Sequence, residues 1–399
     1  MQTRIPEAVL NTPEGREAEA ILRRCVHCGF CTATCPTYRL LGDERDSPRG
    51  RIYLIKQMLE NQPVGAHTRQ HLDRCLLCRS CETTCPSGVR YSRLLEIGRE
   101  TLEHRRPRPL HQRLQRAALR WLLPEPRRFA RLLDTARRLR PLLPAELRKR
   151  IPARADSGPL PTGDHARRVI LPGGCVQPAL DPAIDRATAR VLDRLGIGVI
   201  RAGGCCGAVD LHLSAPERAR QRARANLAAW QPLLEAGAEA VLSNASGCGL
   251  MIKEYRDLLP DDETARRVAG ATLDLVELLE REDLSPLGQP GKGRRIAFHP
   301  PCTLQHGQKL AGRVERLLAR LGFELVPFDD ARICCGAAGT YSLLQPKLAR
   351  RLRDDKLENL LARGPELVAT ANIGCQTHLA AASPVPVVHW ITLLTEGAS

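Results

Sequence analysis

The spacing of apolar residues changes once along this chain, at about residue 165. Before that point apolar positions recur at helical spacing, and helices are predicted over residues 14–24, 52–59 and 66–74. From residue 91 to about 147 the pattern stays helical, and prolines divide it into short helices. The N-terminal part is therefore predicted to be α-helical.

Beyond residue 165, short apolar runs alternate with helical segments, and the series occurs twice. Helices are expected over residues 185–195 and 311–321. The predicted strands are residues 168–172, 198–201 and 240–243 in the first copy and 294–298, 323–327 and 367–371 in the second. Strand, helix, strand, helix, strand predicts a parallel sheet with helices on its faces.

These patterns predict four parts of the chain. They are a helical domain (1–100), a helical connector (101–165) and two tandem α/β repeats (166–290 and 291–399). Residues 152–164 are rich in Pro, Gly, Ala and Ser, which makes them the best candidate for a linker.

Two cysteine runs in the helical domain carry the clearest chemistry. Each has the form C-x2-C-x2-C-x3-C-P, in which three thiolates converge on one iron-sulfur cluster and the fourth serves the other cluster. The predicted ligands are Cys25, Cys28, Cys31 and Cys85 for one [4Fe-4S] cluster and Cys75, Cys78, Cys81 and Cys35 for a second. A pair of zinc sites is the alternative, although zinc seldom uses four cysteines packed this closely. Helices on both sides of the runs resemble an α-helical ferredoxin domain.

The two α/β repeats carry matching cysteines. Cys175, Cys205, Cys206 and Cys248 are followed by Cys302, Cys334, Cys335 and Cys375, at offsets of 127, 129, 129 and 127 residues. All lie after predicted strands, at the sheet edge where such loops form one crevice, so the eight converge if the copies face each other. Two adjacent thiolates can bind one metal centre only if the backbone turns sharply between them, and the glycine after each pair permits that turn. Packing of the cysteines as small apolar residues is the alternative.

Tandem Cys-Cys-Gly repeats behind two ferredoxin motifs resemble the cysteine-rich redox subunits of heterodisulfide reductases, anaerobic glycerol-3-phosphate dehydrogenases and glycolate oxidases. The local sequence is most similar to the iron-sulfur subunits of bacterial glycolate oxidases. The matching stretches include Cys25-Val-His-Cys-Gly-Phe-Cys-Thr-Ala-Thr-Cys-Pro-Thr-Tyr38, Gly204-Cys-Cys-Gly-Ala-Val-Asp210, Pro301-Cys-Thr-Leu-Gln-His306 and Ala371-Asn-Ile-Gly-Cys-Gln-Thr-His378.

This resemblance implies a division of labour between subunits. An FAD-containing glycolate oxidase subunit would oxidise glycolate to glyoxylate, and this chain would pass the electrons on to the membrane quinone pool without oxidising substrate itself. No dinucleotide-binding fingerprint is found in the chain, which agrees with that division. Lactate or glycerol 3-phosphate are alternative substrates of the complex. A thiol-disulfide enzyme using Cys205–Cys206 and Cys334–Cys335 is an alternative of another class.

One departure from the wider Cys-Cys-Gly pattern concerns the closing Cys-x-x-Cys of each repeat. Its last position is Met251 in the first copy and His378 in the second. The remaining four cysteines of each copy suffice for an ordinary [4Fe-4S] cluster or a tetrahedral zinc, and His378 is a candidate nitrogen ligand in the second copy.

The charge of the chain, +16, is concentrated in the connector. Residues 105–154 hold sixteen basic and three acidic residues, a net charge of +13. Few aromatic residues and no nucleic-acid module accompany them, which disfavours nucleic-acid binding. A basic amphipathic stretch suits an anionic membrane surface or an acidic partner, and leucines packed on the protein's own body are the alternative.

No apolar run reaches the length of a membrane span, and the N-terminus lacks a signal peptide. The expected location is therefore the cytoplasm, with peripheral contact at the cytoplasmic face of the bacterial inner membrane. Sixteen cysteines in a reducing compartment are more often metal ligands than disulfides.

Overall fold

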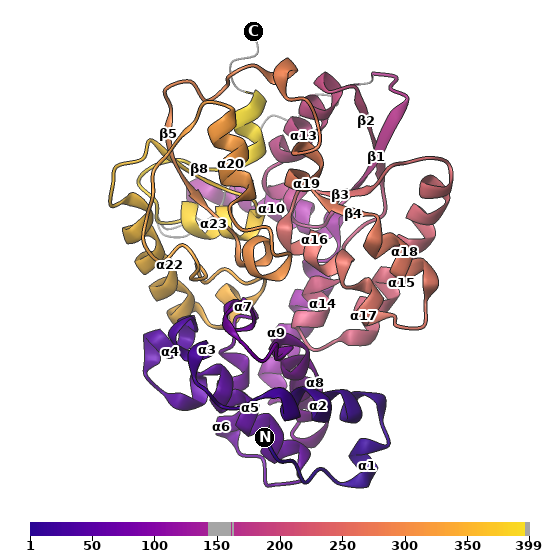
Figure 1. Ribbon diagram of the computed structural model, residues 1–399, viewed down its shortest axis with the longest axis vertical. Helices are drawn as coiled ribbons and strands as arrows, with labels where there is room; N and C mark the ends of the chain where they lie inside the picture. Colours follow the sequence, from indigo (N-terminus) through magenta and orange to yellow (C-terminus); the bar gives the residue numbers. More distant parts are fainter. Residues whose placement is uncertain (143–160, 162, 396–399) are drawn as a thin grey trace.

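A helical N-terminal part lies beneath two α/β lobes (Figure 1), in a computed structural model that describes residues 1–142, 161 and 163–395. The two lobes stand side by side, and helices of the connector run between and behind them. Most of the linker predicted at residues 152–164 lies outside the described residues.

The first 105 residues are helical, as predicted, and contain no strand. The helices are α1 (Glu7–Leu10), α2 (Pro13–Arg24), α3 (Phe30–Ala33), α4 (Pro36–Leu41), η1 (Glu44–Asp46), α5 (Pro48–Leu59), α6 (Ala66–Asp73), α7 (Ser80–Thr84) and α8 (Tyr91–Arg105). Their core is built around α2, α5 and α8, where Leu22, Ile55 and Leu94 are fully buried. Helix α5 begins four residues before the predicted start, because the Ser47 hydroxyl accepts a hydrogen bond from the Gly50 amide at 3.0 Å and Pro48 occupies the first helical position.

The connector forms α9 (Leu110–Leu122), α10 (Pro126–Leu139) and η2 (Arg140–Leu142). Polar side chains of both signs fasten it to the first lobe. Arg120 donates a hydrogen bond to the Leu213 carbonyl at 3.0 Å, and Glu125 pairs with Arg222 at 3.1 Å. Among the described residues, no helix has the length and hydrophobicity needed to span a membrane.

Each lobe contains a four-stranded parallel sheet. The strands are β1 (Arg167–Pro172), β2 (Ile197–Ala202), β3 (Val241–Ser243) and β4 (Thr272–Asp274) in the order β2-β1-β3-β4, and β5 (Arg295–His299), β6 (Glu324–Leu325), β7 (Leu367–Thr370) and β8 (Val387–His389) in the order β6-β5-β7-β8. The six predicted strands are confirmed. The edge strands β4 and β8, of three residues each, were not predicted.

Helices flank both sheets. In the first lobe they are α12 (Gln177–Leu180), α13 (Ala183–Arg194), α14 (Ala208–His212), α15 (Pro216–Glu235), α16 (Ser246–Lys253), α17 (Tyr255–Leu258), α18 (Glu263–Gly270), α19 (Leu275–Leu279) and η3 (Ser285–Leu287). In the second they are the π-helical turn η4 (Thr303–Gly307), α20 (Arg313–Arg320), α21 (Tyr341–Leu344), α22 (Pro346–Leu361), α23 (Ile373–Ala380) and η5 (Trp390–Thr395).

The two lobes share one hydrophobic core, which includes residues of both sheets and of α13, α20 and η5. The loops after their strands also meet. The Ser246 hydroxyl lies 2.8 Å from the Thr303 hydroxyl, and the Ser246 amide donates to the Ala371 carbonyl at 3.1 Å. The copies therefore face each other at the edge where the strands end, which is the condition under which the eight repeat cysteines were expected to converge.

Polar side chains fix the helical part against both lobes. Arg79 forms a two-pronged ion pair with Glu254 of the first lobe. Arg39 forms another with Asp330 of the second lobe, at 2.9 and 2.7 Å. The Thr83 hydroxyl lies 3.0 Å from the His306 ring nitrogen Nδ1. The helical part thus contacts both lobes through side chains near its two cysteine runs.

Candidate metal centres

The first predicted set of cluster ligands lines one cavity. The thiols of Cys25, Cys28, Cys31 and Cys85 all face it, together with that of Cys81. Cys25 ends α2, Cys85 ends α7, and Cys28 is exposed to solvent. Burial and the neighbouring thiols raise the pKa of Cys31 to about 11, because thiolate charges crowded together repel one another. Such a set suits a cationic iron-sulfur centre, whose charge offsets that repulsion.

The two cysteine runs share an unusual backbone. His27 and Leu77, which precede the second cysteine of each run, have φ angles of 56° and 53°. Gly29 and Arg79, which follow it, have φ angles of 85° and 60°. In each run the residues on either side of the second cysteine thus have a left-handed backbone conformation, which bends the chain around the thiols. Non-glycine residues adopt this conformation only where their surroundings hold them. Arg79 is held by its ion pair with Glu254.

The second predicted set, made by Cys75, Cys78, Cys81 and Cys35, is more deeply buried. Burial raises the pKa of the Cys81 thiol well above its usual range, and charge on Cys78 and Cys75 raises it further. The Tyr91 hydroxyl lies 3.5 Å from the Cys75 sulfur. The structure brings these four thiols together as predicted, and their role as ligands of a second cluster stays a prediction.

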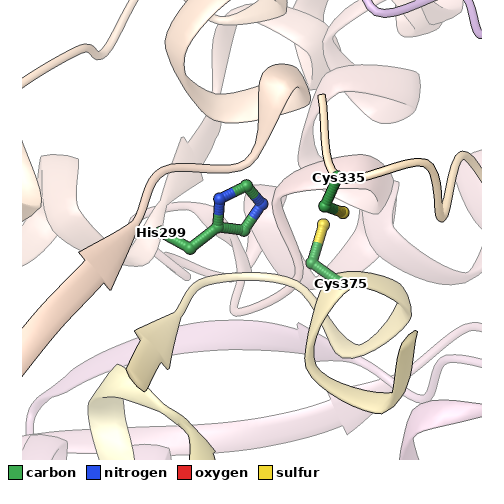
Figure 2. Close-up of side chains that lie close together, drawn as sticks. All are labelled: His299, Cys335 and Cys375. Carbon is green, nitrogen blue, oxygen red and sulfur yellow. The ribbon is translucent and has the colours of Figure 1, made fainter. Parts of the chain in front are cut away.

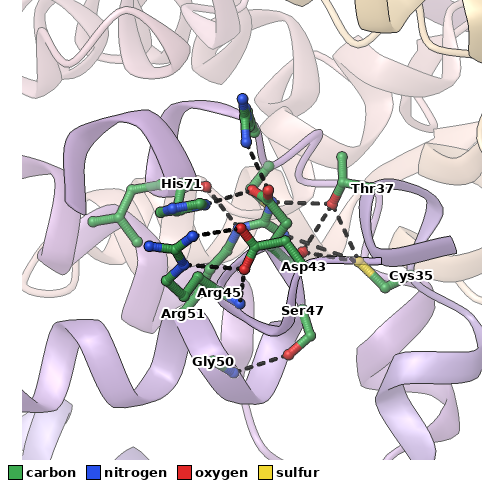
Figure 3. Close-up of polar contacts among 12 residues, drawn as sticks. Cys35, Thr37, Asp43, Arg45, Ser47, Gly50, Arg51 and His71 are labelled. Atoms are coloured by element: carbon green, nitrogen blue, oxygen red, sulfur yellow. Dashed lines mark hydrogen bonds and ion pairs between the residues drawn. The ribbon is translucent and has the colours of Figure 1, made fainter. Parts of the chain in front are cut away.

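A buried arginine supports this second set (Figure 3). Arg51 donates to the Thr37 hydroxyl at 3.0 Å, pairs with Asp46 at 3.2 Å and lies 3.9 Å from the Cys35 sulfur. Asp46 also pairs with Arg74 at 2.8 Å. Asp46 lies near Asp43 and His71 in an arrangement that could hold a metal ion, but its arginine partners already balance its charge. The network therefore places a positive charge beside Cys35.

The four cysteines of the first repeat form one group. The Cys206 and Cys248 sulfurs are 3.5 Å apart, and hydrogen bonds from the Cys175 and Cys206 thiols lower the pKa of the Cys205 thiol. The turn after the cysteine pair depends on Gly207, which has a φ of 92° and lies where a Cβ atom would come within 3.2 Å of the Ala219 carbonyl oxygen. Four convergent sulfurs fit a [4Fe-4S] cluster or a tetrahedral zinc.

The second repeat has a corresponding group of four cysteines, with a histidine beside it. The Cys302 and Cys334 sulfurs are 4.0 Å apart, and Cys335 hydrogen-bonds with Cys375. His299, the last residue of β5, has a ring nitrogen within 4.8 Å of the sulfurs of Cys335 and Cys375 (Figure 2).

His299 was not predicted, although its place at the end of a predicted strand was a signal. The candidate that was predicted, His378, has its Nε2 atom 3.1 Å from the Ala349 carbonyl oxygen. His378 is absent from the groups of metal-binding geometry among the described residues, and its ligation stays an untested prediction.

The second predicted cluster site adjoins the second repeat. Leu76, Cys78 and Cys334 belong to one buried cluster, against which Cys302 packs. Burial raises the pKa of the Cys78 thiol well above its usual range, and charge on Cys302 raises it further. The thiol contacts among the eight repeat cysteines fall within each repeat, in two sets, so the expected convergence of all eight is wrong although the copies face each other. The second set lies beside Cys78.

Comparison with known proteins agrees with these centres. A family model described as a 4Fe-4S dicluster domain matches residues 21–89, and one described as a cysteine-rich domain matches residues 171–253 and 296–380. The chain is 54% identical to the glycolate oxidase iron-sulfur subunit of Escherichia coli K12, over 99% of both chains. It is 30% identical to a probable glycolate oxidase iron-sulfur subunit of Bacillus subtilis, over 98% of this chain and 97% of the relative. It is 25% identical to a lactate utilization protein A of Exiguobacterium, over 56% of this chain and 95% of the relative.

Proposed function

The chain belongs to the family of glycolate oxidase iron-sulfur subunits, and we propose from this premise that it carries electrons from an FAD-containing partner subunit to membrane quinone. Oxidation of glycolate to glyoxylate on the partner removes a hydride from carbon and a proton from the hydroxyl group. The two electrons of that hydride would pass through this chain one at a time, and the quinone would take them up with two protons.

The contact between Cys78 and the second repeat carries this proposal. Iron-sulfur clusters bound at the two cysteine runs would supply one-electron carriers. The residues of this chain would hold those carriers close together, because the second set of thiols shares α3, α7 and their loops with the first. Cys78 is packed against Cys334 in a buried apolar cluster. These contacts support a path that runs from the first cysteine set through the second to the second repeat.

The exposed edge of the first set suits entry of electrons from the partner. Cys28 is exposed, and the side chains next to it in sequence are apolar and open to solvent: Val26 is 67% and Phe30 is 62% exposed. Apolar side chains of this kind form the buried centre of protein interfaces. We assign the docking site of the FAD-containing subunit to this edge, where its flavin would be nearest to a thiolate ligand.

The connector supports the proposed membrane contact. Several of its apolar side chains face solvent between arginines; they are Leu110, Leu114, Trp121, Leu132, Leu139 and Leu142. Other connector residues turn inward, as Arg108 does in its ion pair with Asp73 and as Leu133 does in its burial. The expectation of leucines packed on the protein's own body thus holds for a part of this stretch, and the exposed apolar side chains support the proposed membrane contact for the rest. Each basic residue near an anionic surface contributes about 1 kcal/mol, and salt screens the attraction.

Vesicle binding tests the membrane contact. The assembled complex should bind vesicles of anionic lipid at low salt and lose binding as salt rises. Replacing Leu114 and Trp121 by serine should weaken it further, whereas a serine at Leu343, an exposed leucine of the second lobe, should not. Equal binding by both variants would exclude the connector as the contact.

Electron transfer in the assembled complex tests the main proposal. Cys28→Ser and Cys78→Ser should abolish glycolate-dependent quinone reduction, while glycolate oxidation by an artificial dye that accepts electrons at the flavin should persist. Full quinone reduction in either variant would refute the proposed path. Comparing glycolate with lactate in the same assay addresses the alternative substrate that the name of the Exiguobacterium relative suggests.

A further inference from the structure

We propose that His299 is a nitrogen ligand of a metal centre in the second repeat, which it shares with the thiolates of Cys335 and Cys375. The three residues come from three places in the chain: the end of β5, the loop after β6 and the first turn of α23. Their ligand atoms lie within 4.8 Å of one another, and all three residues are buried. Figure 2 shows the imidazole pointing toward the two sulfurs.

The polar atoms of His299 are unexplained without a ligand. The residue is 1% exposed, and neither ring nitrogen has a hydrogen-bond partner among the residues that the structure describes. A buried polar group without a partner is destabilising, so such groups are rare in folded proteins. Its backbone is held, because the His299 carbonyl accepts a hydrogen bond from the Thr370 hydroxyl at 3.0 Å. Bonding of one ring nitrogen to a metal would remove an unsatisfied buried atom.

The other histidines of the second repeat fit the role less well. His389 accepts a hydrogen bond from the Ile391 amide at 3.3 Å, and although its Nε2 atom is also buried without a partner, the residue belongs to no group of metal-binding geometry among the described residues. Both ring nitrogens of His306 are engaged, with the Thr83 hydroxyl at 3.0 Å and with the Arg332 carbonyl oxygen at 2.9 Å. The Nε2 atom of His378 is 3.1 Å from the Ala349 carbonyl oxygen. His299 therefore fits the role of nitrogen donor better than His378, which had been predicted for it.

The first repeat has no equivalent donor. Cys175 and Cys302 are 127 residues apart, and the same offset places Pro172 opposite His299. Each of these two residues is the last of its strand, β1 or β5, so the match is structural as well as sequential. Proline offers no ligand atom in its side chain. The two repeats therefore hold different centres, one with sulfur ligands alone and one with sulfur and nitrogen.

The donor set selects a class of metal. Thiolate and imidazole ligands suit zinc or an iron-sulfur centre, and Cys302 and Cys334 lie close enough to complete either. In iron-sulfur centres, histidine in place of cysteine raises the reduction potential. An iron centre here would therefore draw electrons from the cluster held by Cys78, which deepens the proposed function and depends on it.

The test measures the ligands directly, on the full chain purified without oxygen. Iron and zinc are counted per chain in the wild type, His299→Ala and His299→Cys, with His306→Gln and His378→Gln as controls. An iron centre should show magnetic coupling to histidine nitrogen in pulsed EPR, and a zinc centre should show a nitrogen neighbour in X-ray absorption. Either signal should be lost in both His299 variants and kept in both controls.

His299→Cys guards against a folding defect, because cysteine can keep the metal while the nitrogen signal disappears. A nitrogen signal that survives in the His299 variants, that is lost only in His378→Gln, or that is absent from the wild type would overturn the proposal. These measurements need no glycolate. A complex that fails to oxidise glycolate would refute the proposed function and leave the ligation of His299 standing.

Discussion

Replacing Arg51 by methionine should lower the reduction potential of the second cluster. The guanidinium is 1% exposed and lies 3.9 Å from the sulfur of Cys35, a predicted ligand of that cluster. A positive charge at this distance favours the reduced cluster, which carries one more negative charge. Methionine removes the charge and fills a similar apolar volume.

The expected shift follows from the distance. At 3.9 Å two unit charges interact by about 4 kcal/mol with an effective dielectric constant of about 20. The added electron is shared by the whole cluster, and Asp46 at 3.2 Å from Arg51 opposes the guanidinium, so roughly a quarter of this energy, about 1 kcal/mol, should remain. For one electron that corresponds to a fall of about 40 mV.

A redox titration followed by EPR measures this shift. Arg51→Lys keeps the charge and should change the potential less, and Arg45→Met, in the same segment but exposed, should leave it unchanged. The first cluster serves as an internal reference. A potential that stays constant or rises in Arg51→Met, with both clusters present, would show that the arginine does not act through its charge.

Two further substitutions test the buried carboxyl group of Glu96 and the proposed docking site at Phe30. Burial and the charge of Glu254 raise the pKa of Glu96 to about 7, so the folded protein must keep this carboxyl group protonated over a pH range in which the unfolded chain ionises it. Above pH 7, Glu96→Gln should therefore raise the free energy of unfolding by about 1–2 kcal/mol, after allowance for the 23% exposure of the Glu96 side chain, and the melting temperature should rise with it. The gain should fade as the pH falls toward 4.5. A gain independent of pH would contradict the assignment. Phe30→Glu should weaken binding of the FAD-containing subunit about tenfold, which corresponds to a loss of about 1.4 kcal/mol, and titration of one subunit with the other measures it. Leu343→Glu is the matched control, and an equal loss of affinity in both variants would exclude the Cys28 edge as the docking site.

The sequence was most informative where chemistry requires a fixed spacing. The cysteine runs predicted which thiols lie near one another, because three thiolates of one run must lie within a few residues to reach the same cluster, and the fourth position points to the other run. The six predicted strands were found for a similar reason, since a buried strand needs a run of apolar residues. His299 and the contact of Cys78 with Cys302 were not predicted. A single histidine has no spacing, and the docking of the helical part on the second repeat depends on side chains more than two hundred residues apart.

The burial of Cys78 against Cys334 has a consequence for biogenesis. Both thiols lie at the junction between the helical part and the second repeat, and both are buried there. A cluster held by Cys78 would therefore be inserted before the helical part closes onto the second repeat, and Arg39 and Asp330, whose ion pair joins the two parts, would form their contact last. The same packing that brings these thiols together would then set the order of maturation.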